Sequence, residues 1–282
     1  MVNKSVGQIV MLKSRLYKFI GRFLFPNKGV THIKRSPKLI VSLTSHPGRI
    51  HVVEKTIESI LRQSLKPDVV ILWLADSQFP NKERSLPKSL VRYKKHGLQI
   101  RWCDDLKSYK KLIPALRTFP DDIIVTADDD IIFWENWLEA MYASYLKHPD
   151  CIHGHHAYHY QFDEEWNLLN ISVNNDITIL YGTYILGSGA GILFPPHSLS
   201  EEATKVDFME LAPSNDDIWW WAMARLKATP ILLVEQKCEN IVCIKDTQDD
   251  GLWVSVNSKG EGSRQFKNII SRFPELWNFL DQ

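Results

Sequence analysis

The stretch Ile123-Ile124-Val125-Thr126-Ala127-Asp128-Asp129-Asp130-Ile131-Ile132 decides the fold, because apolar residues run directly into three adjacent carboxylates. The apolar run predicts a strand buried on both faces, as in a parallel sheet. Carboxylates at the carboxyl end of such a strand lie at the crevice where open α/β sheets bind ligands. Three adjacent anions repel one another, so the stretch indicates a site for a hard divalent cation, Mn²⁺ or Mg²⁺. A solvated acidic turn is the alternative.

Residues alternate direction along a strand, which gives an expectation for the three aspartates themselves. Asp128 and Asp130 are expected to share one face, while Asp129 points away from it.

The chain has 282 residues, of which 44% are hydrophobic and 24% are charged. This composition is that of a globular protein and excludes a disordered chain. The four cysteines (Cys103, Cys151, Cys238 and Cys243) lack both the paired spacing of a zinc site and the density of a disulfide scaffold. They favour a reducing, cytoplasmic setting. No apolar run reaches the roughly 18 residues that a membrane span needs, and no cleavage site of a secretory signal follows the first apolar residues.

The charge is distributed unevenly along the chain. No Asp or Glu precedes Glu54, whereas ten Lys and Arg residues do, although the net charge of the whole chain is only +1. Residues 6–25 predict an amphipathic helix with a basic face, the pattern of a helix lying at a membrane interface. An ordinary helix packed on the body of the protein is the alternative. The acidic remainder argues against a nucleic-acid partner.

After a linker over residues 26–37, the chain alternates between expected strands and helices. Strands are expected at 39–43, 69–74, 98–102 and before Asp128, with helices at 52–63, 86–96 and 109–117. This alternation predicts a parallel sheet with crossover helices. Because a polar cluster follows each strand, these clusters are expected to gather along one edge of the sheet.

The second half of the chain is less regular. A helix is expected over 136–146, a strand over 151–162 and another over 231–234. A further helix over 218–227 follows an expected N-cap at Ser214 or Asn215. The last twenty residues predict a helix that breaks at Pro274.

Several of these features together resemble the nucleotide-sugar-dependent glycosyltransferases of the GT-A fold. They are the turn Thr44-Ser45-His46-Pro47, Asp76 after the second strand, Lys111 before the triple aspartate, the turn Gly187-Ser188-Gly189-Ala190-Gly191 and the helix start Asn215-Asp216-Asp217-Ile218-Trp219. The likeness is to bacterial family-2-like enzymes that build surface polysaccharides, and it covers roughly residues 38–245. Asp-x-Asp alone is a weak motif, but its place after a buried strand makes it more specific.

The resemblance implies a fold and a domain arrangement. The fold would be α/β, a Rossmann-like and mostly parallel central sheet flanked by helices, preceded by the amphipathic N-terminal helix. Residues 1–37 would form the basic leader and linker, and residues 38–250 the glycosyltransferase domain. That domain would divide into a nucleotide-binding half, 38–134, and an acceptor half, 135–250. Residues 251–282 would form a C-terminal helical extension.

The resemblance also implies which residues bind the donor and the metal. Asp130 would be the direct metal ligand, Asp128 a ribose or metal partner, and Asp129 could replace either in a shifted register. Lys111 would contact the donor diphosphate, while its neighbour Lys110 is interpreted as a solvent-exposed residue of a helix. The remaining positions of the donor site would contact the base and ribose: Thr44, His46, Arg49 and Asp76. Each of these four could equally be a turn residue.

Asp216 and Asp217 resemble the acidic pair that supplies the catalytic base in inverting members of the family, with Asp217 at the position of the base. A carboxylate within reach of an acceptor hydroxyl can take its proton as that oxygen attacks the sugar. Aspartate in the first turn of a helix is also common for electrostatic reasons alone. The tryptophans that follow suit either sugar stacking or the core.

Four histidines lie close together in the expected strand 151–162. His153, His155 and His159 would share a face of that strand, which is compatible with metal binding. No cysteine or carboxylate at ligand spacing completes such a site. We therefore interpret them, together with His156, as buried hydrogen-bonding groups or acceptor contacts.

The resulting prediction is a peripheral membrane glycosyltransferase at the inner face of the cell membrane. It would transfer a sugar, with UDP as the favoured nucleotide carrier, to a saccharide or lipid-linked acceptor, with inversion and a divalent cation. A metal-dependent hydrolase or phosphodiesterase that uses the same carboxylates is an alternative. A retaining glycosyltransferase and a non-catalytic sugar- or membrane-binding module are the others.

Overall fold

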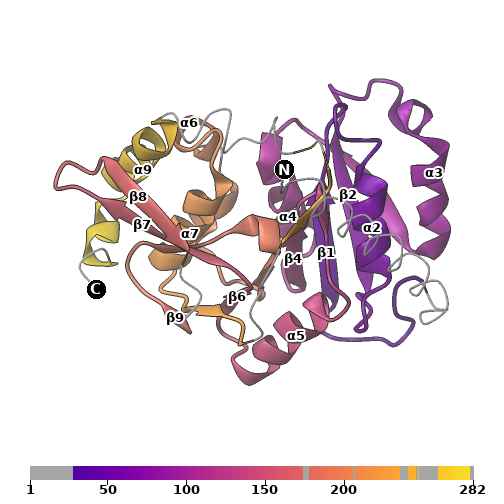
Figure 1. Ribbon diagram of the computed structural model, residues 1–282, viewed down its shortest axis with the longest axis horizontal. Coiled ribbons are helices and arrows are strands. Elements are labelled where there is room, and N and C mark those ends of the chain that lie inside the picture. Colours follow the sequence, from indigo (N-terminus) through magenta and orange to yellow (C-terminus); the bar gives the residue numbers. More distant parts are fainter. Residues whose placement is uncertain are drawn as a thin grey trace, which may run out of the picture.

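The computed structural model describes residues 28–173, 178–205, 207–235, 241–245, 247 and 260–279. The first half of the described chain, in indigo to magenta, lies beside the second half, in orange to yellow (Figure 1). The helix expected over residues 6–25 lies outside the described residues. No described helix is long and apolar enough to cross a membrane.

The main sheet has eight strands in the order β3-β2-β1-β4-β11-β6-β12-β9. Within it β11 and β9 run antiparallel to their neighbours, and the other strands are parallel to one another. In that order the strands are Leu98–Cys103, Val69–Ala75, Leu39–Thr44, Ile123–Ala127, Ile192–Phe194, Ile152–Gly154, Ile231–Leu233 and Ile179–Leu180. The mostly parallel sheet predicted from the sequence is therefore confirmed.

Strands β1 and β4 are apolar because both faces of the sheet are covered. On β1, Leu39, Val41 and Leu43 pack in one core cluster, while Ile40 packs in a second cluster on the opposite face. Successive side chains of a strand project to opposite faces of the sheet, so a continuous apolar run packs into both core clusters. Strand β4 repeats the pattern with Ile124 on the second face.

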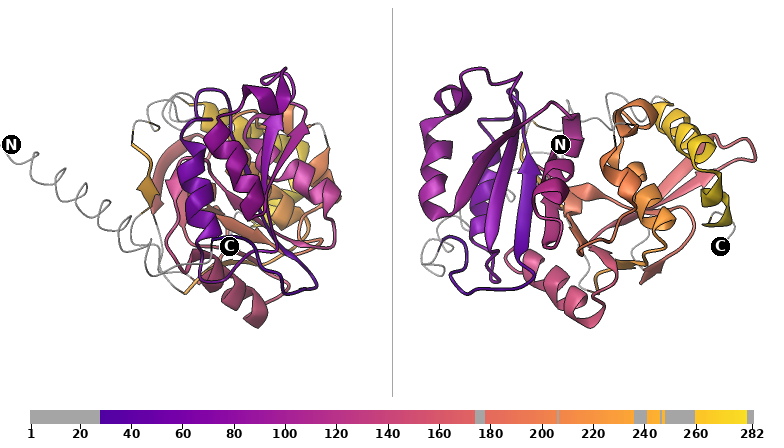
Figure 2. Two further views of the ribbon diagram at one scale, coloured as in Figure 1. Left: turned by 90° about the vertical axis from the view of Figure 1, so that its right-hand side faces the viewer. Right: turned by 180° about the vertical axis from the view of Figure 1, so that it is seen from behind.

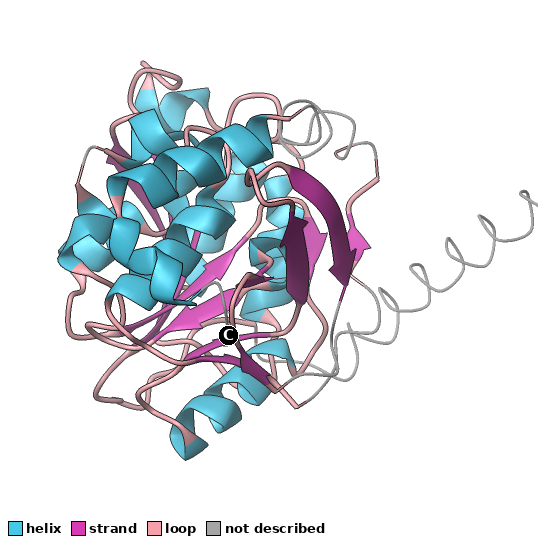
Figure 3. Cartoon of the chain, turned by 90° about the vertical axis from the view of Figure 1, so that its left-hand side faces the viewer, coloured by secondary structure: helices cyan, strands magenta, loops and turns pink. Residues whose placement is uncertain are grey.

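Helices cover both faces of the sheet. Helices α2 (Val53–Leu61), α3 (Lys88–Val91) and α5 (Trp137–Lys147) contribute to the first cluster, and Figure 2 shows α2 and α3 in front of the sheet in its left view. Helices α4 (Ile113–Thr118), α6 (Phe208–Leu211), α7 (Asp216–Leu226) and α9 (Glu261–Arg272) contribute to the second. Figure 3 shows the helices of this side next to the strands of a smaller sheet.

Two smaller sheets complete the described structure. One has three antiparallel strands in the order β10 (Tyr184–Leu186), β7 (Ala157–Phe162) and β8 (Leu168–Val173). The other pairs β13 (Val242–Cys243) with β5 (Ile131–Ile132), which brings residues 242–243 beside the segment that follows the triple aspartate. Short 3₁₀ helices occupy Lys82–Ser85, Arg92–His96, Lys107–Lys111, Ser188–Ala190, Glu201–Thr204 and Pro274–Phe279.

The structure differs from the sequence-based expectations at three elements. The helix expected over 109–117 is the 3₁₀ helix Lys107–Lys111 followed by α4. The helix expected over 86–96 is the short α3 followed by a 3₁₀ helix. The strand expected over 151–162 is two strands, β6 and β7, in different sheets. Strand β6 ends at Gly154. Leu186 packs so closely against this glycine that an added Cβ would lie 2.7 Å from Leu186 Cδ2. The chain then turns through His155, whose side chain is fully buried.

Candidate active site

The candidate site lies where the order of the parallel strands reverses. Strand β1 lies between β2 and β4, although β4 is the last of the first four in sequence. Open α/β sheets bind ligands outside the carboxyl ends of the strands at such a point. Thr44 ends β1, Asp76 follows β2 and the triple aspartate follows β4. The sequence prediction that these polar residues gather at one sheet edge is confirmed.

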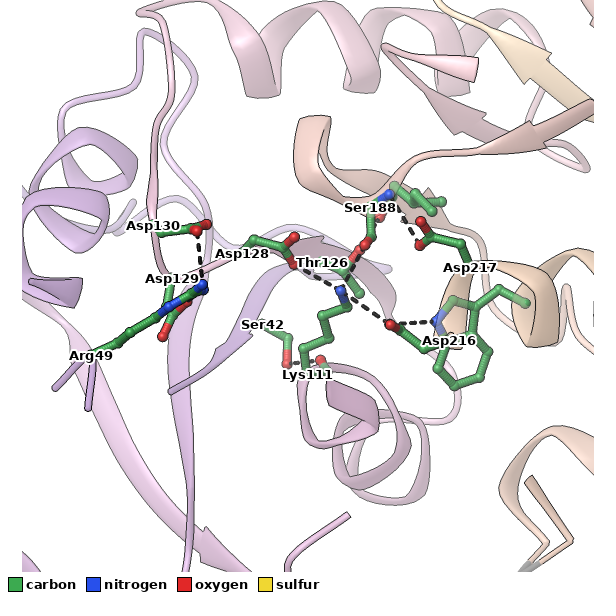
Figure 4. A network of polar contacts seen from close by, with 12 residues as sticks. Ser42, Arg49, Lys111, Thr126, Asp128, Asp129, Asp130, Ser188, Asp216 and Asp217 are labelled. Atoms are coloured by element: carbon green, nitrogen blue, oxygen red, sulfur yellow. Dashed lines mark hydrogen bonds and ion pairs between the residues drawn. The ribbon is translucent and has the colours of Figure 1, made fainter. Parts of the chain in front are cut away.

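The triple aspartate is divided in two rather than alternating along a strand. Strand β4 ends at Ala127, and Asp129 and Asp130 form a turn. Asp129 and Asp130 both contact Arg49, whose Nη1 lies 3.0 Å from a carboxylate oxygen of each. Asp128 instead contacts Lys111 (Figure 4). The expectation that Asp128 and Asp130 share a strand face is wrong, because the strand has ended before them.

Arg49 links three segments of the chain. Besides the two carboxylates, its Nη2 donates a hydrogen bond of 2.7 Å to the backbone oxygen of Thr247. Burial lowers the pKa of Arg49, but Asp129 and Asp130 outweigh it, so the net shift is upward. Ser45 Oγ donates to the second oxygen of Asp129 at 2.6 Å. This carboxylate is therefore held from two sides.

A second cation, Lys111, lies between the end of β4 and the start of α7. Its Nζ is 2.7 Å from Asp128 Oδ1, 2.8 Å from Ser188 Oγ and 3.0 Å from Asp216 Oδ2. Figure 4 shows the lysine pointing into the space between these groups. Burial opposes its charge, yet Asp128 and Asp216 raise its pKa above the ordinary value. The lysine is therefore protonated at every pH at which the protein is expected to function.

The helix start at Asp216–Asp217 follows directly from local sequence. Asn215 caps α7, because its side-chain oxygen accepts a hydrogen bond of 3.4 Å from the backbone N–H of Ile218. This confirms one of the two expected caps. Asp216 is buried and accepts a further hydrogen bond of 3.2 Å from the indole N–H of Trp220. The tryptophans of α7 are buried in the core, so none of the three offers an exposed ring to a sugar.

Asp217 has the electrostatic environment of a general base. One of its oxygens accepts a hydrogen bond of 3.2 Å from the backbone N–H of Ser188. The side chain also borders a cavity of about 10 Å³ whose other lining residues are apolar. Burial, followed by the charge of Asp216, raises the pKa of Asp217 to about 7. A carboxylate with a pKa near neutrality is suited to taking a proton at physiological pH.

The residues fit a divalent cation in charge and in chemistry. The triple aspartate and the Asp216–Asp217 pair outnumber the two cations among them, Arg49 and Lys111. Burial, followed by the charge of Asp128, raises the pKa of Asp130, although Arg49 acts in the opposite direction. Within the described ranges, no three His, Cys, Asp or Glu side chains gather closely enough to hold a metal alone. Mg²⁺ sites commonly use one or two carboxylates and are completed by substrate phosphates and water.

The other predicted donor residues lie at the edge of the site. Thr44 Oγ1 donates to the backbone oxygen of Trp73 at 2.9 Å, so its hydroxyl can still accept a hydrogen bond. His46 is exposed, and Asp76 is exposed and contacts Lys82. Their roles in donor binding stay predictions.

The sequence-based interpretation of Lys110 is wrong, and that of the four histidines is only partly right. Lys110 is not solvent-exposed but 2% exposed, with its ammonium 2.6 Å from Asp105. The histidines do not converge: His153 and His155 are buried and hydrogen-bonded to backbone oxygens of His148 and Trp137. His159 instead stacks on a tyrosine ring of β10. The interpretation of His153 and His155 as buried hydrogen-bonding groups is confirmed.

Three residues near the carboxylates were not singled out from the sequence. Ser45 and Ser188 contact the carboxylates of Asp129 and Asp217, and both stand in turns that the sequence had marked as important. The third, Tyr158, is half-buried, and its pKa is raised by burial and by its proximity to Asp217 and Asp128. No local signal marks Tyr158, because it reaches the site only through the strand pairing of the smaller sheet.

Gly191 is required for the turn that carries Ser188. It has a φ of +87°, and a Cβ there would lie 2.5 Å from Trp137 Cζ2. We expect Gly191→Ala to lower the free energy of unfolding by about 3 kcal/mol through overpacking and backbone strain. Urea denaturation measures this. Gly189→Ala is the control, because its Cβ would only be 3.8 Å from Asp128 Oδ2; equal losses in both variants would contradict the expectation.

The sequence matches no protein-family model, and no curated protein matches it either. Many solved structures are similar in part, and three of them are described below. A CMP:2-keto-3-deoxy-manno-octonic acid synthetase complexed with CTP has 12% identity and a TM-score of 0.43, over 73% of this chain and 92% of that one. The mannosyltransferase PcManGT from Pyrobaculum calidifontis, in complex with GDP-Man and Mn²⁺, has 16% identity and a TM-score of 0.34, over 49% and 41%. S. aureus TarS 1–349 has 11% identity and a TM-score of 0.45, over 71% and 58%.

Proposed function

We propose that this protein is a glycosyltransferase that moves a sugar from a nucleotide-sugar donor to an acceptor hydroxyl with inversion. The observation that carries the proposal is that the triple aspartate and the Asp216–Asp217 pair lie close together where the order of the parallel strands reverses. Asp128 and Asp216 lie 2.7 and 3.0 Å from the same Lys111 ammonium, so the triple aspartate and the helix start form one site.

The residues divide the reaction between them. The proposed base is Asp217, which takes the proton of the acceptor hydroxyl as the oxygen forms a bond to the anomeric carbon. The bond from that carbon to the diphosphate oxygen breaks, and its electron pair stays on the phosphate. A divalent cation held by Asp130 and Asp128 would stabilise the charge on this leaving group. Asp129 would be its neighbour in the donor site, fixed in place by Ser45 and Arg49.

The nucleotide is proposed to lie along the carboxyl ends of β1 and β2. There Asp76 and Thr44 are available as acceptors for base or ribose groups, with His46 and Arg49 in the turn that follows β1. UDP is the proposed carrier, and a saccharide or lipid-linked saccharide of bacterial surface polysaccharide synthesis is the proposed acceptor. Both assignments come from the resemblance noted in the sequence.

Peripheral membrane binding is proposed for the basic leader, which would place the enzyme at the inner face of the membrane. Its support is the absence of acidic residues before Glu54. A chain lacking residues 1–25 should lose binding to vesicles that contain anionic lipid. If the truncated chain bound these vesicles as strongly as the full chain, the membrane role of this segment would be contradicted, and the alternative of an ordinary packed helix would stand.

The test of the proposed function is a donor screen. The protein is incubated with Mn²⁺, a panel of UDP-, GDP- and CMP-sugars and candidate saccharide acceptors, and separately with phosphodiesters. Release of nucleotide that depends on the acceptor supports glycosyl transfer, and the anomeric proton of the product in NMR shows inversion or retention. Cleavage of phosphodiesters without sugar transfer would make the protein a metal-dependent hydrolase instead.

A further inference from the structure

One buried ammonium connects the donor side of the site with the side that carries the base. Lys111 is 3% exposed and lies at the end of a 3₁₀ helix, Lys107–Lys111, between the two groups of carboxylates. Its three polar contacts come from three separate elements: the end of β4, the turn Ser188–Ala190 and the first turn of α7. Figure 4 shows these contacts radiating from a single nitrogen.

Three polar groups of the protein surround this ammonium, which donates hydrogen bonds to Asp128 and Ser188 and forms an ion pair with Asp216. A lysine ammonium has three N–H donors and no acceptor. Asp128, Ser188 and Asp216 each lie within 3.0 Å of the nitrogen. A donor phosphate would therefore have to compete with these three partners for the ammonium.

The contacts continue from Lys111 to the proposed base. Ser188 accepts from Lys111 with its hydroxyl and donates to Asp217 Oδ1 with its backbone N–H, at 2.8 and 3.2 Å. Moving the lysine would therefore move both the turn and the carboxylate that the turn orients.

The backbone segment that carries Lys111 is also held in place by hydrogen bonds. Its backbone oxygen accepts a hydrogen bond of 2.5 Å from Ser42 Oγ on β1. Tyr109, two residues earlier, donates from its hydroxyl to the backbone oxygen of Ala212 at 2.6 Å, close to the start of α7. The segment that carries Lys111 is thus joined both to the sheet and to the loop that leads into α7.

We propose that Lys111 is a positioning residue that holds Asp128 and the Asp216–Asp217 helix start at a fixed spacing, and that it does not bind the donor diphosphate. This inference rests on the proposed function, in which Asp128 belongs to the donor site and Asp217 is the base. Without the ammonium, the half-buried carboxylate of Asp128 and the buried carboxylate of Asp216 would lose the cation that they share, and their like charges would repel. The acceptor-side helix start would then shift relative to the donor.

The chain offers a matched control for this proposal. Lys110 is the adjacent residue, is 2% exposed and has a carboxylate partner, Asp105, at 2.6 Å. Within the described residues, the ammonium of Lys110 pairs with Asp105 and with none of the site carboxylates. Lys110→Met and Lys111→Met thus remove the same buried charge, but only the second removes it from the site.

The experiment measures turnover and UDP binding separately for both variants. For Lys111→Met we expect kcat to fall about 100-fold, the scale of a misplaced catalytic group. The affinity for UDP in the presence of Mn²⁺, measured by calorimetry, should change by less than about threefold, because no phosphate contact is lost. Lys110→Met should keep the wild-type kcat. A tenfold or larger loss of UDP affinity with kcat retained would show that Lys111 binds the diphosphate, and equal losses of kcat in both variants would also overturn the proposal.

A second measurement, the melting temperature, does not depend on catalysis. It tests the proposal even if the Lys111→Met variant folds poorly. In the double variant Lys111→Met/Asp216→Asn both charges of one ion pair are removed, so it should regain about half or more of the melting temperature lost in Lys111→Met. No recovery would contradict a direct role in holding Asp216. If the wild-type protein turns over no nucleotide sugar, the proposed function fails, whereas this thermal comparison still tests whether Lys111 fixes the helix start.

Discussion

Asp217→Asn is expected to lower kcat by about 10³-fold and to leave the affinity for the nucleotide unchanged within about twofold. Asparagine has the same shape and can still accept the hydrogen bond from the Ser188 N–H, which spans 3.2 Å. It cannot take a proton from an acceptor hydroxyl. Initial rates and UDP titrations separate these two effects, and Asp207→Asn, at the start of another helix, is the matched control. Retention of more than about a tenth of the wild-type kcat would remove Asp217 from the role of base.

If the proposed function is right, the pH dependence of turnover by the wild-type protein should identify the same residue. Burial and Asp216 raise the pKa of Asp217 to about 7, so the carboxyl is protonated, and inactive as a base, at lower pH. We expect kcat to fall as pH decreases below about 7. A flat profile between about pH 5 and 8 would contradict the assignment, because an ordinary aspartate titrates near pH 4.

The stability of Asp217→Asn provides a check on folding. A carboxyl whose pKa is higher in the folded than in the unfolded chain destabilises the fold once the pH exceeds the unfolded value, and fully so above the folded value. Asparagine removes this cost. The variant should therefore be at least as stable as the wild-type protein at pH 8, so that a loss of turnover cannot be attributed to unfolding.

Asp130→Ala is expected to reduce kcat/KM by about 10³-fold at a fixed Mn²⁺ concentration. The change removes one of the two carboxylates proposed to hold the cation, while Arg49 keeps its contact with Asp129 at 3.0 Å. Because burial and Asp128 raise the pKa of Asp130, its negative charge is unfavourable in the fold, and its loss should not destabilise the protein. Nucleotide release and Mn²⁺ binding, the latter by electron paramagnetic resonance, are measured together.

The control for this variant is an aspartate at the opposite end of the same strand. Asp121 lies just before β4 and its side chain is 84% exposed. Asp121→Ala should keep both turnover and Mn²⁺ affinity. Full turnover of the wild-type enzyme in excess chelator would contradict the metal assignment, whatever the result for Asp130→Ala.

The sequence was sufficient to predict the sheet and the place of the site. Ile123–Ala127 could be identified as a doubly buried strand because its apolar residues serve both core clusters. The carboxyl end of a parallel strand is also a fixed location, so the triple aspartate could be placed at the sheet edge without knowledge of its partners.

The partners of each aspartate could not be predicted, because they come from distant segments. Arg49 and Asp129 are 80 residues apart, and Lys111 and Ser188 are 77 apart. Lys110 was misjudged because the alternation of a regular helix was assumed, whereas Lys107–Lys111 is a 3₁₀ helix with both final lysines buried. The segment 151–162 was predicted as one strand because the sequence carries no clear signal for the change of sheet after Gly154.

The most direct measurement is the position of manganese and UDP in a crystal of the protein soaked with both. Anomalous scattering locates the metal without reference to any assumed role of the residues. The account predicts a manganese peak coordinated by the carboxylates of Asp130 and Asp128 and by the diphosphate, with the Lys111 ammonium still on Asp216. A metal and a nucleotide bound away from residues 128–130 would contradict the central claim.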